Sequence, residues 1–190
     1  MRRPMVKGSA GFTLIEIVMV MALIGILAAI AVPRLDFQAY RINGAVRGLN
    51  GLLSRAQRIA VTNQYSVNVV FDVNTNAIKL HEDDDNDNVM DPNERVRTYP
   101  VGEGVVYGLG GAPARLYAAA PISFTRRLNG MPELIFRRDG SASENGGFYI
   151  TTANAPASGR TSDARSIEVI RATGRSEWYR YTATGWQRKF

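Results

Sequence analysis

The sequence predicts an α+β fold in which a long N-terminal helix, half apolar and half amphipathic, packs on an antiparallel β-sandwich. Three observations predict it. Residues 12–32 are apolar except for one acid, and residues 35–60 repeat apolar side chains at helical spacing. After residue 63 the pattern changes to short, alternating, β-branched segments separated by Gly, Asn and Pro. The length of 190 residues suffices for one domain plus an N-terminal appendage.

The composition excludes several classes of chemistry. The chain has no cysteine and a single histidine, His81, so disulfides, thiolate nucleophiles and the usual zinc sites are ruled out. No G-x-S-x-G motif and no phosphate-binding glycine loop is present. We therefore expect a protein that is not an enzyme. The net charge of +6 is unevenly spread, because bases gather before residue 12 and at the C-terminus, and acids within residues 82–94.

The apolar run has the length of a membrane-spanning helix. Residues 12–32 read FTLIEIVMVMALIGILAAIAV, and a helix of this length covers roughly 30 Å, the thickness of a bilayer core. A secretory signal peptide has a shorter apolar region, of about 7–15 residues, followed by small residues at the cleavage site. Here the small residues Ala10 and Gly11 precede the run. The sequence therefore predicts a single transmembrane segment.

Glu16 is the only ionisable residue in this run. A carboxylate at the centre of a bilayer costs roughly 2.5–3.5 kcal/mol on insertion scales, so such a group normally has a partner. Cleavage before Phe12 would create an α-amino group one helical turn from Glu16. That amine is a candidate counter-charge, in the same or in a neighbouring subunit.

A basic leader, Gly11 and the segment that follows it together resemble the class III signal of type IV pilins and type II secretion pseudopilins. The segment reads Phe12-Thr13-Leu14-Ile15-Glu16. The resemblance implies that prepilin peptidase cleaves after Gly11 and methylates the amine of Phe12, and that Glu16 sets the register of a subunit in its filament. It also implies a single-pass protein of the bacterial inner membrane with its C-terminal domain in the periplasm.

The predicted organisation is a cleaved leader (1–11), a transmembrane or filament-core helix (12–32), an amphipathic helix (33–63) and a β domain (64–190). Pro33 is expected to kink the helix rather than end it, because periodicity resumes at once. The apolar stripe comprises Leu35, Ile42, Val46, Leu49, Leu53, Ala56 and Ala60. Gly44, Gly48 and Gly51 weaken this helix, and they permit either close packing or local melting.

Eight strands are predicted in the β domain, with long loops at 102–121 and 154–163. They cover residues 65–72, 77–81, 95–99, 122–125, 133–137, 147–152, 166–171 and 176–182. The second half of the domain resembles the GspH/FimT group of minor pilins and pseudopilins. The motifs that carry the resemblance are Leu134-Ile135-Phe136, Asp139-Gly140-Ser141-Ala142, Gly146-Gly147-Phe148-Tyr149-Ile150, residues 166–170 and Thr173-Gly174-Arg175.

This second resemblance implies a long helix on a β-sandwich and a structural function. We expect a minor pseudopilin of a type II secretion pseudopilus, with other pseudopilins or pilins as filament partners. The alternative is a FimT/FimU-like minor pilin of a type IV pilus that primes assembly or binds DNA during uptake.

An acidic segment has the ligand spacing of an EF-hand calcium loop. Positions 1, 3, 5, 7, 9 and 12 of the window 83–94 are Asp83, Asp85, Asp87, Val89, Asp91 and Glu94, with Val89 offering its carbonyl. Asn88 stands where glycine is usual, but asparagine tolerates the left-handed conformation. The flanks are predicted strands instead of helices. The alternative to a calcium site is a solvated acidic hairpin tip.

The C-terminal tail alternates bases with aromatic residues. The bases are Arg171, Arg175, Arg180, Arg188 and Lys189, and the rings are Trp178, Tyr179, Tyr181, Trp186 and Phe190. Such a combination binds single-stranded nucleic acid, and some FimT-like relatives act in DNA uptake through a basic region that begins with Gly-Arg, as at Gly174 and Arg175. We favour the alternative, an edge hairpin with rings packed inward and arginines solvated.

Overall fold

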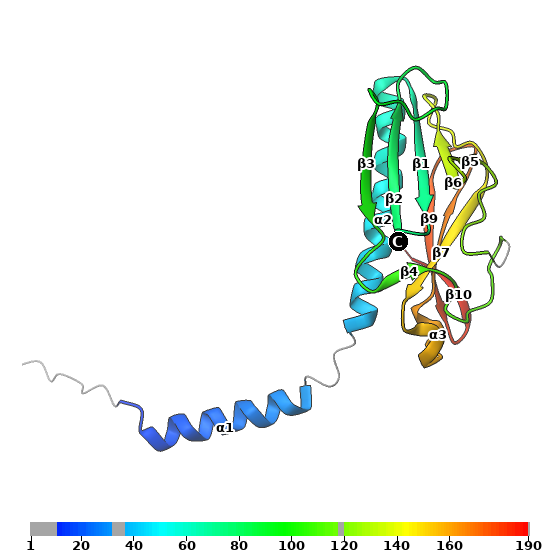
Figure 1. Ribbon diagram of the computed structural model, residues 1–190. Helices are drawn as coiled ribbons and strands as arrows, with labels where there is room; N and C mark the ends of the chain where they lie inside the picture. The colour runs from blue at the N-terminus through cyan, green and yellow to red at the C-terminus, as the bar shows by residue number, and fades with distance from the viewer. Residues whose placement is uncertain (1–10, 32–36, 118–119, 190) are drawn as a thin grey trace, which may run out of the picture. The chain divides into compact units, whose positions relative to one another are not determined.

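The computed structural model describes residues 11–31, 37–117 and 120–189 (Figure 1). The chain divides into two compact units, Met1–Phe37 and Gln38–Phe190. The basic leader before Gly11, the predicted kink at Pro33, Leu35 of the apolar stripe and Phe190 of the tail all lie outside the described residues.

The N-terminal unit contains α1, which runs over Leu14–Ala31. All its large apolar side chains from Leu14 to Leu27 are exposed within the chain. A helix with apolar side chains on every side is normally covered by lipid or by other protein. In the described part of the chain, no helix combines the length and the apolar character needed to cross a membrane.

The long helix of the second unit, α2, runs over Phe37–Asn63, and its apolar stripe lies where the periodicity predicts it. The buried side chains of α2 are Ile42, Val46, Leu49, Leu52, Leu53, Ala56 and Ala60. Six of them belong to the predicted stripe, and Leu52 extends it. Burial of a Leu or Ile side chain is worth about 1.5–3 kcal/mol, so this stripe accounts for much of the attachment of α2.

Two five-stranded antiparallel sheets make up the rest of the unit. The first has the order β3-β2-β1-β6-β5, with β1 at Ser66–Asp72, β2 at Ala77–Asp83, β3 at Arg95–Pro100, β5 at Arg127–Leu128 and β6 at Met131–Phe136. The second has the order β10-β9-β8-β7-β4, with β4 at Val105–Tyr107, β7 at Gly146–Thr152, β8 at Arg165–Val169, β9 at Ser176–Thr182 and β10 at Gly185–Lys189. The predicted α+β class, a helix packed on antiparallel sheets, is confirmed.

One hydrophobic core joins α2 to both sheets. α2 runs along the sheet that contains β1, β2 and β3 (Figure 1). Phe71 of the first sheet lies 5.0 Å from Phe148 of the second and 5.2 Å from Phe124, measured between ring centroids. Aromatic contacts at this spacing add about 0.5–1.5 kcal/mol to area burial. The two sheets and the helix therefore share a single interior.

A buried arginine also connects α2 to the second sheet. Arg165 of β8 is fully buried, and its Nε and Nη2 donate to Oδ1 of Asn43 on α2 at 3.2 and 2.9 Å. Its Nη1 donates to the carbonyls of Ser162 and Ala164 at 2.7 and 2.9 Å. Burial, together with the nearby charge of Arg180, lowers the pKa of Arg165 to about 10.

Several predictions about the strands are wrong, each for a local reason. Residues 122–125 form only an isolated bridge, from Ile122 to Phe148. The predicted loop 102–121 contains β4, a three-residue strand whose Val105 is buried against the core. The predicted loop 154–163 contains α3 (Ala155–Ser158) and a short 3-10 helix, η2 (Thr161–Asp163). The short strands β5 and β10 were also not predicted, because two to five residues carry too little periodicity.

Candidate functional site

The residues predicted to take part in N-terminal processing and assembly lie just before and inside the first turn of α1. Gly11 and Phe12 precede the helix, and the ring of Phe12 is exposed. Thr13 directly precedes Leu14, the first helical residue, and its Oγ1 accepts a hydrogen bond from the amide of Glu16 at 3.3 Å. This is the helix-capping contact that Ser and Thr make in this position. Sequence reasoning missed it, although Thr followed three residues later by Glu is a capping pattern.

The first turn of α1 thus carries one acidic side chain on an otherwise apolar helix. A carboxylate there interacts favourably with the partial positive charge of the helix N-terminus.

The comparisons with known proteins concern this segment. Residues 6–32 match the family model of the prokaryotic N-terminal methylation motif. The motif supports a type IV pilin-like protein. It also supports pilin-like subunits as filament partners and a prepilin peptidase as the processing enzyme. No characterised protein and no solved structure shows a significant match to the chain.

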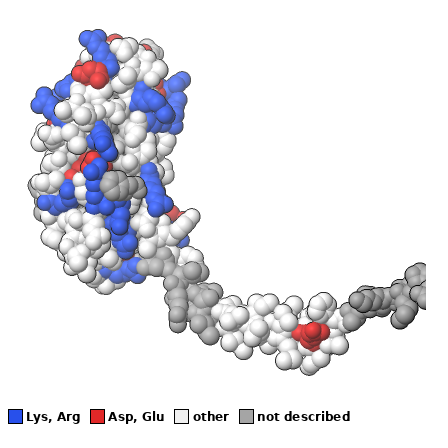
Figure 2. Space-filling model, turned by 180° about the vertical axis from the view of Figure 1, so that it is seen from behind, with Lys and Arg blue, Asp and Glu red and all other residues white. Residues whose placement is uncertain are grey.

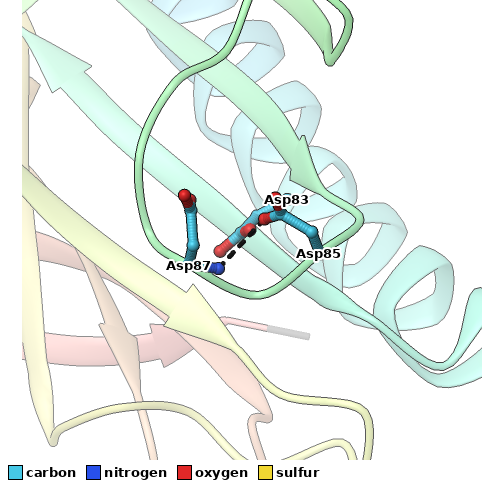
Figure 3. Close-up of side chains that lie close together, drawn as sticks. All are labelled: Asp83, Asp85 and Asp87. Carbon is cyan, nitrogen blue, oxygen red and sulfur yellow. Dashed lines mark hydrogen bonds between the residues drawn. The ribbon is translucent and has the colours of Figure 1, made fainter.

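The acidic segment begins on the last residue of β2 and forms the connection to β3. Asp83, Asp85 and Asp87 each bring one carboxylate oxygen within 4.8 Å of the others (Figure 3). Asn86 and Asn88 both adopt the left-handed conformation, with φ of 63° and 62°, which asparagine tolerates. The chain therefore turns tightly enough to bring alternate acids together.

The other predicted acidic ligands, Asp91 and Glu94, do not belong to this cluster. Glu94 is directed at His81 of β2, whose Nε2 contacts Oε2 of Glu94. The amides of Asp84 and Asp91 donate to Glu94 at 3.2 and 2.9 Å. The amide of Val89 donates to Oδ1 of Asp87 at 2.7 Å. Glu94 thus closes the loop through protein donors, and Asp91 lies beside it.

Two pKa values reflect this division of roles. Burial raises the pKa of the Asp83 carboxyl above its usual range. Burial would also raise the pKa of Glu94, but the amide of Asp91 and the ring of His81 outweigh it and lower the pKa. The charge of the buried Glu94 is therefore stabilised by hydrogen bonds within the protein, whereas the charge of Asp83 is stabilised less well by the described protein groups.

His81 and Asn68 support the loop from the face of the first sheet, and both are fully buried. Nδ2 of Asn68 lies 3.3 Å from Nδ1 of His81 and donates to Oδ1 of Asn88 at 3.2 Å. Sequence reasoning placed His81 at a strand end and gave Asn68 no role. The available signal was the alternation of polar residues on two strands that turned out to be paired, Asn68 opposite His81.

The basic tail forms the β9–β10 hairpin at the edge of the second sheet. Arg175 and Arg188 both lie against one carboxylate, that of Glu177, with Nε of Arg175 at 3.6 Å. Arg180 alternates to the other face of β9 and pairs in register with Arg165. Arg171 lies before β9 and is exposed, and Lys189 pairs in register with Trp178 at the open end of the hairpin. Arg175, Arg188 and Lys189 line one pocket at this end, whereas Arg180 is not among its lining residues.

Trp178, Tyr179 and Trp186 of the tail are occupied by protein contacts. Trp178 is buried in the core. Nε1 of Trp186 donates to the carbonyl of Pro113 at 3.0 Å, and the guanidinium of Arg115 lies 3.4 Å from the ring centroid of Tyr179. These contacts hold the segment around residues 113–115 onto the outer face of the second sheet. Rings held in this way are not available for base stacking without displacement of that segment.

A more continuous basic surface lies on α2. The helix contains no Asp or Glu, and its arginines Arg41, Arg47, Arg55 and Arg58 are all exposed. Lys and Arg outnumber Asp and Glu on the face of the molecule seen from behind (Figure 2). Arg41 also lies 3.5 Å from the exposed Glu103, a pair that solvent weakens strongly.

Proposed function

We propose that the chain is a minor pseudopilin, a structural subunit of a type II secretion pseudopilus that supports protein export. The observation that carries the proposal is the methylation motif at residues 6–32, which ends in an apolar helix with one acid in its first turn. After cleavage following Gly11, the carboxylate of Glu16 would pair with the methylated amine of Phe12, in its own or a neighbouring subunit. The role proposed is structural and involves no catalysis.

The same reasoning supports a location in the bacterial inner membrane before assembly, with Gln38–Phe190 on the periplasmic side. The exposed apolar side chains of α1 need lipid or neighbouring helices around them. In the filament, like helices would replace the lipid. Residues 12–32 would thus act as an anchor first and as an assembly element afterwards.

The proposal is tested at the N-terminus and then at Glu16. Mass spectrometry of the chain extracted from membranes should find an N-methylated Phe12 as the first residue. Glu16→Ala should leave membrane insertion intact and abolish cross-linking to other subunits of the filament. Retention of Met1, or normal cross-linking of the variant, would contradict the proposal.

Thr13→Val is the matched control for Glu16→Ala. It removes the hydroxyl that accepts the amide of Glu16 but keeps the carboxylate. If the charge of Glu16 matters, Thr13→Val assembles normally or nearly so. If both variants fail alike, the first turn of α1 is needed for its conformation, and the pairing role of Glu16 is wrong.

The second candidate is a minor pilin of a type IV pilus that primes assembly or binds DNA. The exposed bases Arg171, Arg175, Arg188 and Lys189 at the edge hairpin favour it. Identification of the neighbouring subunits in a pull-down from membranes separates the two candidates. Salt-sensitive DNA binding that Arg175→Ala weakens at least tenfold would favour the pilus, because phosphate contacts respond to ionic strength.

A further inference from the structure

Three carboxylates at the end of β2 lie together without a neutralising side chain. One oxygen each of Asp83, Asp85 and Asp87 lies within 4.8 Å of the other two. Among the described residues, no ion pair joins a lysine, arginine or histidine nitrogen to any of these three carboxylates. Like charges at this spacing repel one another, so a bound cation would stabilise the cluster.

The buried member of the cluster has an oxygen without a donor. Asp83 is 1% exposed, and its Oδ1 is buried with no hydrogen-bond partner among the described residues. Its Oδ2 accepts the amide of Asn88 at 3.1 Å. Buried carboxylate oxygens are almost always paired with a donor or a metal, so an unpaired one indicates a missing partner. Oδ1 of Asn68, under the same loop, is likewise buried without a donor.

The backbone orients the two exposed members of the cluster. The amide of Asp87 donates to Oδ1 of Asp85 at 3.1 Å, and the amide of Val89 donates to Oδ1 of Asp87 at 2.7 Å. Each aspartate therefore uses one oxygen to hold the turn. The second oxygen of each side chain can serve a ligand without loss of these bonds.

We propose that Asp83, Asp85 and Asp87 form a calcium site that stabilises the β2–β3 connection. Calcium binds oxygen ligands at about 2.3–2.6 Å, so two oxygens on one ion can lie up to about 5 Å apart. Magnesium binds at about 2.0–2.1 Å, which limits the separation to about 4.2 Å. Three oxygens that all lie within 4.8 Å of one another can bind one calcium ion without rearrangement. This site is independent of the filament function proposed above.

The proposed site differs from an EF-hand loop in its last ligand. In the EF-hand pattern the twelfth residue binds the ion through both carboxylate oxygens. Here both oxygens of Glu94 already accept protein donors, from Asp84, Asp91 and His81. Glu94 is therefore a positioning residue that braces the loop, and the ion is bound by the first three acids alone, completed by water.

The cluster is accessible to an ion from a neighbouring cavity of about 590 Å³, whose lining includes Asp83, Asn86 and Asn88. Arg126, Arg137 and Arg138 line the same cavity. The alternative to a calcium ion is the guanidinium of one of these arginines, which would neutralise the carboxylates instead. The two possibilities differ in one measurable respect, because only a metal site responds to calcium.

The experiment measures calcium binding by the full chain in detergent after dialysis against a chelator. Isothermal titration with calcium chloride should show one site, with a dissociation constant of about 10⁻⁴–10⁻³ M, as in extracellular calcium modules. Calcium at about 100 times that constant should raise Tm by about 4 °C or more. Magnesium chloride should have less than a third of this effect.

Two double variants separate the proposed ligands from the general charge of the loop. Asp85→Asn with Asp87→Asn changes exposed residues only, and should abolish the rise in Tm and weaken binding at least tenfold. Asp84→Asn with Asp91→Asn removes the same amount of charge outside the cluster. This variant should keep the rise in Tm and the dissociation constant for calcium within about threefold of the wild-type values. Absence of heat and of a Tm shift in the wild-type chain, equal effects of the two double variants, or equal effects of magnesium and calcium would each overturn the proposal.

Discussion

Gln57 of α2 donates its side-chain amide to the carbonyl of Gly140 at 2.7 Å. The same Nε2 donates to the carbonyl of Thr173, also at 2.7 Å. Gly140 lies in the turn after β6 and Thr173 in the turn before β9, so one side chain fixes two turns, one from each sheet, against the helix. Both turns are separated from Gln57 in sequence by more than 80 residues.

Gln57→Ala should therefore destabilise the globular unit. Loss of the donor leaves two carbonyls without their partner, and each lost bond costs about 0.5–1.5 kcal/mol. We expect the free energy of unfolding to fall by about 1–3 kcal/mol, measured by chemical denaturation. Ser54→Ala is the control on the same helix, because the Ser54 hydroxyl bonds only the local carbonyl of Asn50. It should change stability by less than about 0.5 kcal/mol, and equal losses for the two variants would contradict the assigned role of Gln57.

Gly174→Ala should be among the most damaging small substitutions in the tail. Gly174 has a φ of 61°, and a Cβ there would lie 2.2 Å from the carbonyl oxygen of Gly140 and 2.5 Å from Nε2 of Gln57. Backbone strain and overpacking together predict a loss of about 2–4 kcal/mol in unfolding free energy. The Gly-Arg pair thus has a structural requirement at its first residue that does not depend on any DNA contact.

Gly130→Ala is the matched control for this prediction. Gly130 also has a positive φ, 79°, but a Cβ there meets no described atom within 4 Å. Its loss should be limited to the strain of about 1–2 kcal/mol. A Gly174→Ala protein as stable as the Gly130→Ala protein would show that the turn relaxes away from Gly140.

Gly48→Ala should act in the opposite direction. Gly48 lies inside α2, is exposed, and has open space around its Cβ position. Alanine in an exposed helix interior is favoured over glycine by about 1 kcal/mol, so Tm and unfolding free energy should rise. A fall in stability would show that this helix face is covered in solution. If the variant gains stability but assembles poorly into filaments, the bare backbone serves contact with a neighbouring subunit.

Asp72 should set part of the acid sensitivity of the domain. Nζ of Lys79 lies 2.8 Å from its Oδ2, and this contact, with the amide of Thr75, lowers the pKa of Asp72 to about 2. A carboxyl whose pKa is lowered by folding stabilises the folded state above its unfolded pKa of 3.8, and this contribution is lost as the pH falls toward 2. Asp72→Asn should lower stability by about 1–2 kcal/mol at pH 7 and flatten the decline between about pH 4 and pH 2. If the unfolding free energies of the variant and the wild type fall in parallel across this range, groups other than Asp72 cause the acid sensitivity.

The features predictable from sequence are those encoded within one element. The stripe from Ile42 to Ala60 could be predicted because helical periodicity is local. The position of Glu94 could not be predicted. Its spacing matches a calcium loop, but its contact with His81 depends on the pairing of β2 with β3. Spacing indicates which residues can meet, but not which partner each one takes.

Contacts between distant segments could not be predicted from the sequence, for a similar reason. The bonds from Gln57 to Thr173 and from Arg165 to Asn43 join residues 116 and 122 positions apart. Arginine is usually solvated, so nothing in the sequence distinguishes Arg165 from the exposed Arg171. The sequence likewise does not distinguish the bases of the tail from one another, whereas the two faces of β9 separate Arg180 from Glu177 and its partners.

The buried guanidinium of Arg165 couples separate parts of this domain during folding. A charged side chain leaves water at a high free-energy cost unless its acceptors are already in place. Its acceptors come from α2, through Asn43, and from the chain at Ser162 and Ala164. The helix, η2 and the second sheet are therefore coupled to one another through this one buried side chain. An intermediate with α2 detached would keep Arg165 hydrated and the second sheet open on that side.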